Sequence, residues 1–498
     1  MHNFLYNFYP ILIEIYITAN ICLLLMYGVF LSTFPNFGYP LLGKNFTLLT
    51  LLILSFSLIL IFRHIPLSII GLDNFLINDL FTYYTKLILI LSTIGWFCLS
   101  SKYFVSEKVN NYELWILILL SVVAMLTILQ SYDLLTIYLA IEFQSLIFYI
   151  LASINRTSEF STESGLKYFV LGAFSSAFLL WGSSIIYGLT GLTNLNDLSK
   201  FFAGFLLNEN LFSHNLVIGF IFILVALLFK LSAAPFHIWS PDVYEGAPLI
   251  ITAFFSILPK FAIVGLLFRF LLYTFYDLLL FWQSIILFST LLSIFIGTFG
   301  AFAQYKWKRF LAYSSINHIG FILLAMLNGD LEGVSSVIFY LIVYIIMMLG
   351  IFAFVINTKI HSYPAFYQVR YLSELNGLAK YNPFLALVVT ILLFSMAGIP
   401  PMAGFFSKLF VLLIALQVNS FGISLSAIII SCIACFYYIR LIKGMYFEPS
   451  FNDWKIIEPM NKLSSLVLGV AGILTLFIFV DVEVISAISL VMAIPLLY

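Results

Sequence analysis

Long apolar runs separated by short polar stretches repeat along the whole chain. A run of about 20 apolar residues matches the length of an α-helix that crosses the hydrocarbon core of a bilayer. The sequence therefore predicts an all-α polytopic membrane protein. The apolar tail after Glu483 is too short for a clear fifteenth span, and we expect it to lie along the membrane surface. The fourteen predicted spans are residues 11–32, 46–63, 79–101, 112–130, 132–154, 164–190, 216–239, 248–276, 280–303, 310–328, 332–356, 383–416, 422–446 and 463–485.

The overall composition excludes other large classes of protein. Hydrophobic residues make up 63% of the 498, charged residues make up 9%, and the formal net charge is zero. No soluble domain buries that much apolar surface, so lipid must be the solvent. The low charge density also excludes a basic groove for nucleic acid. Cys432 and Cys435 form a C-x-x-C inside an apolar run, where we expect small apolar residues and no redox or metal chemistry.

Basic residues are distributed unequally between the two sets of loops. With fourteen spans, fifteen of the 22 Lys and Arg residues fall in loops on one face, and two fall on the face that holds both termini. The positive-inside rule then puts both termini on the outer side of the membrane. The many Phe and Tyr residues, 54 and 29, are a compositional hint of an organelle-encoded protein.

Two of the predicted spans contain interruptions. The seventh holds Pro235 and the twelfth holds Pro400 and Pro401, and proline breaks or unwinds a helix because it lacks an N–H. The breaks are five helices apart, so matching units must be inverted relative to each other, a pattern typical of transporters. We expect a three-helix N-terminal segment, two inverted five-helix repeats and a C-terminal helix with its tail, at residues 1–111, 112–278, 279–446 and 447–498.

Three lysines occupy positions where a charge is costly. Lys230, Lys260 and Lys408 lie in apolar spanning segments, each near a proline. A charged group at the bilayer centre costs at least about 2.5 kcal/mol on insertion scales, so such residues usually face a polar interior and serve ion or proton traffic. Glu142 lies mid-way along the fifth segment, and its countercharge must come from another helix. Lys230 is the candidate, and a static ion pair that fixes helix register is the alternative.

Histidines and one short-range ion pair extend the set of candidates. His318 lies in the tenth segment, and its ordinary pKa near neutrality suits a relay between lysines, although a hydrogen-bonded core histidine is the alternative. His237 follows the seventh-segment proline and either joins the relay or satisfies a freed carbonyl. Glu163 and Lys167 are spaced i, i+4 in the favourable order, which fits an interfacial pair as well as a relay.

Other charged residues are less informative. Lys86 and Arg269 lie nearer the ends of their segments, so we expect their side chains to snorkel to the interface. Glu14 has no obvious partner. Asp242 and Glu245 form an acidic loop on the otherwise basic face, and this loop is either an entrance for protons or simply the chain that follows the break.

Three stretches of the sequence resemble a known family. They are FKLSAAPFHIWSPDVYEGAPLIITAFFSILPK, RFLAYSSINHIGF and FSMAGIPPMAGFFSKLF. They resemble the antiporter-like membrane subunits of respiratory complex I in their fourteen-helix form, and the similarity covers nearly the whole chain from about residue 70 onward. The resemblance implies that the family's ionisable residues on helices five, seven, eight and twelve correspond to Glu142, Lys230, Lys260 and Lys408. It also implies that His318 lies along the family's central hydrophilic axis.

The resemblance implies a function and a set of partners. Members of the family pump protons, driven by electron transfer in a separate arm, so we expect a proton-translocating subunit of NADH:ubiquinone oxidoreductase in the mitochondrial inner membrane. The chain has no dinucleotide fingerprint and no cysteine ladder. We therefore expect no cofactor here, with NADH, FMN, iron–sulfur clusters and ubiquinone in partner subunits. The expected partners are the other membrane-arm subunits and membrane lipids, cardiolipin included.

The resemblance also suggests a route for the proton. In this hypothesis Glu142 sets the charge state of Lys230, and a proton then passes Lys260 and His318 to Lys408 and leaves on the opposite face. Two other functions remain open at this point. One is a stand-alone cation/proton antiporter, which needs no redox partner, and the other is a scaffold whose buried charges serve assembly alone.

Overall fold

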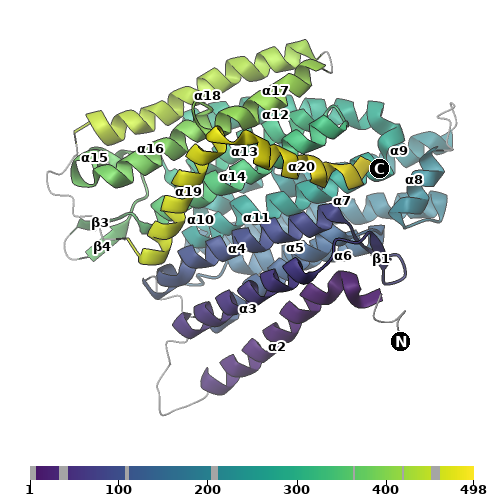
Figure 1. The fold of residues 1–498 in the computed structure, drawn as a ribbon, viewed down its shortest axis with the longest axis horizontal. Helices are drawn as coiled ribbons and strands as arrows, with labels where there is room; N and C mark the ends of the chain where they lie inside the picture. Colours follow the sequence, from purple (N-terminus) through teal and green to yellow (C-terminus); the bar gives the residue numbers. More distant parts are fainter. Residues whose placement is uncertain are drawn as a thin grey trace.

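The fold is a bundle of long helices (Figure 1). The computed structural model describes residues 7–32, 43–106, 111–203, 211–362, 365–417, 420–449 and 460–497. Eleven helices in this part of the chain are long and apolar enough to cross a membrane. They are α2 (Leu12–Ser32), α3 (Gly43–Arg63), α4 (Leu80–Ser106), α5 (Tyr112–Gln130), α6 (Leu134–Ala152), α7 (Glu159–Thr190), α11 (Leu249–Phe268), α12 (Leu279–Phe302), α14 (Leu331–Asn357), α18 (Phe421–Phe447) and α19 (Lys462–Val480).

The three remaining predicted spans are also helical. The seventh is α9 (Leu211–Leu231), the tenth is α13 (Trp307–Met326), and the twelfth is the pair α16 (Pro383–Ala397) and α17 (Ala403–Gln417). The all-α membrane fold with broken seventh and twelfth helices is therefore confirmed. The two breaks differ, because α17 continues for 15 residues whereas the helix after α9 has only eight.

Short elements join the long helices. The sequence pattern did not predict two antiparallel hairpins, β1 (Ile69–Gly71) with β2 (Leu76–Asn78) and β3 (Lys359–Ser362) with β4 (Ala365–Gln368). The label β1 lies at the end of the bundle where α2 begins and α20 ends, and β3 and β4 lie at the opposite end (Figure 1). The short helices are η1 (Tyr9–Ile11), α8 (Leu195–Ala203), α10 (Trp239–Gly246), η3 (Arg269–Thr274), η4 (Tyr276–Leu278), η5 (Leu372–Leu375) and α15 (Leu378–Tyr381).

The C-terminal region differs from the expected span and surface tail. Helix α19 ends at Val480, and a second helix, α20 (Val482–Leu497), begins after Asp481. Helix α20 packs against α4 and α14, where Met492 and Ala493 are completely buried. The tail is therefore part of the helix packing, because its small and apolar residues fit against those two helices.

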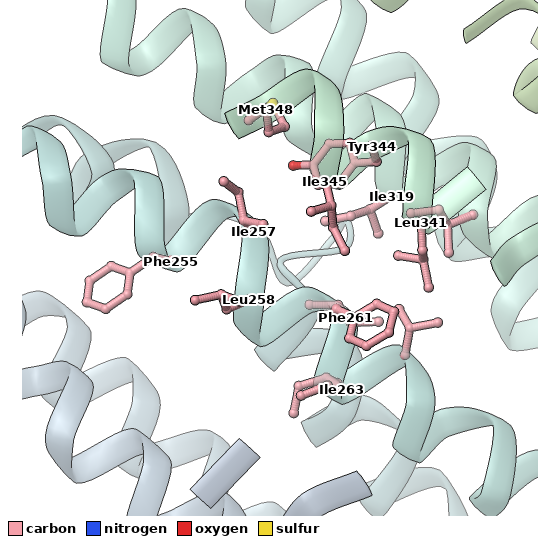
Figure 2. Close-up of a cluster of buried hydrophobic side chains, with 14 of the residues drawn as sticks. Phe255, Ile257, Leu258, Phe261, Ile263, Ile319, Leu341, Tyr344, Ile345 and Met348 are labelled. Atoms are coloured by element: carbon pink, nitrogen blue, oxygen red, sulfur yellow. The ribbon is translucent and has the colours of Figure 1, made fainter. Parts of the chain in front are cut away.

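Helix α11 forms the centre of the bundle. Each of its residues is buried, and its neighbours include α4, α5, α13 and α14. Figure 2 shows Phe261 of α11 near Leu341 of α14, whereas Phe255 of α11 lies apart from the labelled side chains of α13 and α14. In a bilayer, close packing and hydrogen bonds hold helices together, since lipid is as apolar as the side chains. Because α11 is buried on all sides, its lysine, Lys260, is enclosed by the surrounding helices.

Small residues bring α12 and α13 into close contact. A Cβ on Gly297 of α12 would lie 2.5 Å from the backbone nitrogen of Asn317 on α13. A Cβ on Gly320 of α13 would lie 2.5 Å from Ser293 Oγ on α12. Small residues at such contacts allow two membrane helices to approach closely. These contacts lie at Asn317 and Gly320, so α13 is packed closely against α12 both before and after His318.

Candidate functional site

The ionisable residues predicted from sequence lie on neighbouring parts of the helix bundle. Lys230 is at the end of α9, directly before the first break, and Lys408 is on α17, directly after the second. Lys260 is in the middle of α11, and His318 is in the middle of α13. Glu142 is on α6, which packs against α5 and α7.

The Lys408 side chain is hydrogen-bonded to the end of helix α16, at the break that precedes α17. Its Nζ donates hydrogen bonds to the carbonyl oxygens of Met396 at 3.0 Å and Ala397 at 2.7 Å. In an unbroken helix these carbonyls would accept from the N–H groups of residues 400 and 401, and both residues are prolines. The ammonium therefore replaces the two missing donors, which is what buried carbonyls at membrane depth require.

The turn around Lys408 depends on a glycine. Gly398 ends α16 with a φ of +83°, in the left-handed region where glycine is favoured. A Cβ at this position would also lie 2.8 Å from Lys408 Cδ. Phe321 of α13 covers the other side, with its ring centroid 5.5 Å from Nζ. The second break is thus shaped to receive this lysine.

Lys260 follows Pro259, which leaves one carbonyl of helix α11 without its backbone donor. Pro259 has no N–H for the carbonyl of Phe255, and the Tyr244 hydroxyl donates to this oxygen at 3.2 Å. The Tyr344 hydroxyl donates to the carbonyl of Ser256 at 3.1 Å. The two tyrosine rings flank the amine, since each centroid is 5.9 Å from Lys260 Nζ.

The lysine itself is left without such a bond. Among the described residues, Lys260 Nζ has no hydrogen-bond partner, although its residue is only 3% exposed. The carbonyls beside Pro259 accept from tyrosine hydroxyls here, whereas the carbonyls of the second break accept from Lys408. The two lysines therefore occupy opposite environments: one has two strong acceptors and the other has two aromatic faces.

His318 lies between tyrosines in the same core. Its Nδ1 is 2.7 Å from the Tyr340 hydroxyl, and its Nε2 is 3.4 Å from the Tyr438 hydroxyl. The ring of Tyr344, which flanks Lys260, has its centroid 5.5 Å from that of His318. Lys260 and Lys408 are both near enough to act on the imidazole electrostatically. The histidine thus lies within the influence of both lysines.

Lys230 and Glu142 do not form an ion pair in this structure. The Glu142 carboxylate accepts hydrogen bonds from Ser145 at 2.8 Å and Ser176 at 3.2 Å. Lys230 Nζ is buried and has no hydrogen-bond partner in the described part of the chain. Glu142 is nevertheless close enough to act on Lys230 electrostatically. A functional pairing of the two remains a prediction, and sequence spacing overlooked Ser145 as a local partner.

The secondary candidates lie at the edge of this core. His237 is in the first break, and its Nδ1 is buried without a partner among the described residues. Glu163 and Lys167 form the expected ion pair at 2.8 Å, with exposed fractions of 60% and 44%. Lys167 also reaches Asp242 on α10 at 3.1 Å. This pair therefore belongs to an interfacial network.

Asp242 and Glu245, which were expected in a loop, lie on helix α10 and pair with basic residues. Arg309 contacts Asp242 at 2.7 Å and Glu245 at 2.8 Å, and Lys306 also pairs with Glu245. Burial raises the pKa of the Asp242 carboxyl, but hydrogen bonds from Arg309 and Lys167 outweigh it and leave the pKa below its usual value. The contacts attach α10 to α7 and α13.

Two charged residues that were expected to snorkel are buried instead. Lys86 pairs with Glu14 at 3.0 Å, and both are 2% exposed. Arg269 contacts both carboxylate oxygens of Asp79 at 2.9 Å. The snorkelling prediction was wrong because each residue has an acidic partner on a helix or turn far away in sequence. Gln130 also donates to Glu14, at 2.8 Å, so the missing partner of Glu14 is now identified.

Metal binding has no obvious location in the described residues. They contain no group of three or more His, Cys, Asp or Glu side chains placed to hold an ion. The functional groups that sequence reasoning missed are the hydroxyls of Tyr244, Tyr340, Tyr344 and Tyr438. Of these four, only Tyr244 could have been expected from the sequence, because Pro259 leaves the Phe255 carbonyl without a backbone donor.

Known proteins resemble this chain along most of its length. A model of the family described as "NADH:quinone oxidoreductase/Mrp antiporter, TM" matches residues 131–434. The NADH-ubiquinone oxidoreductase chain 2 of Marchantia polymorpha is 42% identical over 480 residues, which are 96% of each chain.

Solved structures share the fold. A chain of respiratory complex I from Thermus thermophilus with bound aureothin superposes with a TM-score of 0.78 at 24% identity, covering 96% of this chain and 99% of that one. A chain of the Mrp complex from Dietzia sp. gives 0.79 at 18% identity, covering 98% and 97%. The chain therefore belongs to the NADH:quinone oxidoreductase/Mrp antiporter family, as an antiporter-like complex I membrane-arm subunit similar to chain 2.

Proposed function

We propose that this subunit translocates protons across the mitochondrial inner membrane along Glu142, Lys230, Lys260, His318 and Lys408. The observation that carries the proposal is the contrast between the lysines. Lys408 Nζ has two carbonyl acceptors, whereas Lys260 Nζ has none among the described residues. An ammonium brings three donors and is costly to bury unpaired, so the contrast favours a charged Lys408 and a neutral Lys260.

A difference in charge between neighbouring amines is what a relay requires. In the proposed cycle a proton gained by Lys230 is passed to Lys260, and His318 then carries it to Lys408. Glu142 would set the charge of Lys230 through the field that links them. The proton would leave Lys408 toward the opposite face. Lys230 supports this scheme because its buried Nζ, like that of Lys260, has no partner in the described part of the chain.

The driving energy would arrive from neighbouring subunits. We infer that NADH, FMN, iron–sulfur clusters and ubiquinone bind in other subunits of the complex, and that lipids such as cardiolipin surround the helices. We further propose that residues 112–278 and 279–446 are inverted repeats, with both termini on the intermembrane-space side. The start of α2 and the end of α20 lie at one end of the bundle, which fits an even number of spans (Figure 1).

The test uses the purified complex that contains this chain, reconstituted into liposomes. Proton uptake and NADH oxidation are measured together in Lys260→Ala and Lys408→Ala. We expect fewer protons pumped per NADH in both variants. The matched control is Lys380→Ala, because Lys380 is an exposed lysine on α15. Full pumping per NADH in both axis variants would refute the proposal.

The stand-alone cation/proton antiporter is the second candidate, because the matching family includes Mrp antiporters. The Mrp chain from Dietzia sp. supports only a shared fold at 18% identity. Purification separates the two functions: a complex I subunit is recovered with NADH:quinone reductase activity, and an antiporter subunit is not. A scaffold role is tested by the same variants, since it requires lost assembly with unchanged pumping per assembled complex.

A further inference from the structure

Each nitrogen of the His318 ring faces the hydroxyl of a tyrosine. Tyr340 on α14 lies 2.7 Å from Nδ1, and Tyr438 on α18 lies 3.4 Å from Nε2. His318 and Tyr340 are each 1% exposed, and Tyr438 is 0% exposed. The three residues come from three different helices. Their side chains therefore form one enclosed row of hydrogen-bonding groups, Tyr340–His318–Tyr438.

The chemistry of these groups limits how the row can be arranged. A neutral imidazole has one N–H and one bare nitrogen, whereas a hydroxyl both donates and accepts. One tyrosine must therefore accept from the N–H while the other donates to the bare nitrogen. The tautomer of His318 and the directions of the two hydroxyl hydrogens are thus linked.

Passage of a proton reverses the arrangement. A proton that binds the bare nitrogen gives an imidazolium with two N–H groups, and both tyrosine oxygens then accept. When the proton on the other nitrogen leaves, the ring is neutral again in the opposite tautomer. One proton has entered and one has left, and both hydroxyl hydrogens must turn before the next transfer.

We propose that Tyr340 and Tyr438 are positioning residues that hold the His318 ring and set its tautomer between transfers. This proposal rests on the relay proposed above. The distance from Nδ1 to the Tyr340 hydroxyl is shorter than that from Nε2 to the Tyr438 hydroxyl, so Tyr340 holds the ring more firmly. The charged groups that act on the ring are Lys260 and Lys408, one for each direction of transfer.

Neighbouring tyrosines supply controls. Tyr344 is close to the histidine ring, but its hydroxyl is bound to the Ser256 carbonyl. Tyr437 is completely buried and packs against the Tyr438 ring with centroids 4.4 Å apart. The Tyr437 hydroxyl makes no hydrogen bond to His318. Tyr437→Phe therefore removes a neighbouring buried hydroxyl and keeps both contacts of the histidine ring and the aromatic packing on Tyr438.

The experiment compares Tyr340→Phe, Tyr438→Phe and Tyr437→Phe in the reconstituted complex. We expect the first two to lower the number of protons pumped per NADH, because each variant loses a hydroxyl that lies beside the imidazole. Tyr437→Phe should pump like the wild type. The pH profile of pumping should also shift in Tyr340→Phe, since the hydroxyl stabilises one state of the imidazole. A merely structural defect would lower pumping by the same factor at every pH.

A double variant separates this inference from the relay itself. Tyr340→Phe should cause no further loss in a His318→Gln background, because the tyrosine acts through the histidine. Full pumping by both Phe variants, with His318→Gln impaired, would overturn the positioning role and leave the relay intact. Full pumping by His318→Gln would overturn the relay. Losses that simply add would also overturn the positioning role, and Tyr438→Phe provides the test if Tyr340→Phe does not assemble.

Discussion

Lys408 takes over a hydrogen bond that Pro401 cannot make. Its Nζ donates at 2.7 Å to the carbonyl oxygen of Ala397, four residues before that proline. The same amine also serves the carbonyl of Met396, four residues before the other proline of the break. The lysine is therefore both a candidate proton carrier and a structural part of the broken helix.

The first prediction concerns this double role. Lys408→Met removes both hydrogen bonds, and each carbonyl left unpaired costs about 1–3 kcal/mol. We expect a lower midpoint of thermal unfolding for the solubilised complex, together with reduced pumping. Lys380→Met is the matched control, because it removes an exposed amine from α15. An unchanged midpoint in Lys408→Met would show that other groups satisfy the two carbonyls.

The second prediction concerns the Phe255 carbonyl, which Pro259 leaves without a backbone donor. Tyr244→Phe should destabilise the chain by about 1 kcal/mol, since the carbonyl of Phe255 loses its donor. In a Pro259→Ala background the helix supplies its own N–H, so the same change should cost less. Thermal unfolding of the two single variants and the double variant measures this coupling. Equal costs in both backgrounds would contradict the assignment of Tyr244 as a substitute donor.

The third prediction concerns the buried pair of Glu14 and Lys86. Glu14→Gln leaves an ammonium buried without its counterion, and breaking such a pair costs about 3–5 kcal/mol. Removal of both charges in Glu14→Gln/Lys86→Met should restore much of the loss. Glu483→Gln, at an exposed carboxylate on α20, should leave the unfolding midpoint unchanged. A double variant as unstable as Glu14→Gln alone would exclude the buried charge as the cause.

The fourth prediction concerns pH and helix α10, which Asp242 attaches to its neighbours. The pKa of this carboxyl is lower in the folded chain than its ordinary value of about 3.9, despite the opposing effect of burial. Its contribution to stability is therefore present above the ordinary value and is lost as pH falls through the folded pKa. We expect the midpoint difference between wild type and Asp242→Asn to shrink as the pH is lowered. A difference independent of pH would contradict this origin.

The apolar pattern predicted the helices because spanning length is fixed by bilayer thickness. Prolines predicted both broken helices for an equally direct reason, the loss of an N–H. The boundary near Asp481 was not predicted, because α19 and α20 form one apolar run apart from that residue and its neighbour Glu483. Local composition cannot show where such a run bends, since the bend depends on packing against α4 and α14.

Side-chain partners were much harder to predict than helices. Glu14 and Lys86 are 72 residues apart, and Asp79 and Arg269 are 190 apart, so no local spacing connects them. The tyrosines around the axis were missed for a different reason. The sequence contains 29 tyrosines, and nothing in the local pattern distinguishes Tyr340 from those that face lipid. Only the helix arrangement brings its hydroxyl to the imidazole.

The close contact between α12 and α13 restricts the movement of α13. Gly297 lets the two backbones approach so closely that a sliding or rotating α13 would collide with its neighbour. Close packing against α12 therefore holds the helix that carries the His318 imidazole in place. The two helix breaks, between α9 and α10 and between α16 and α17, lack a continuous backbone ladder of hydrogen bonds, so a change of shape costs less there than in α13.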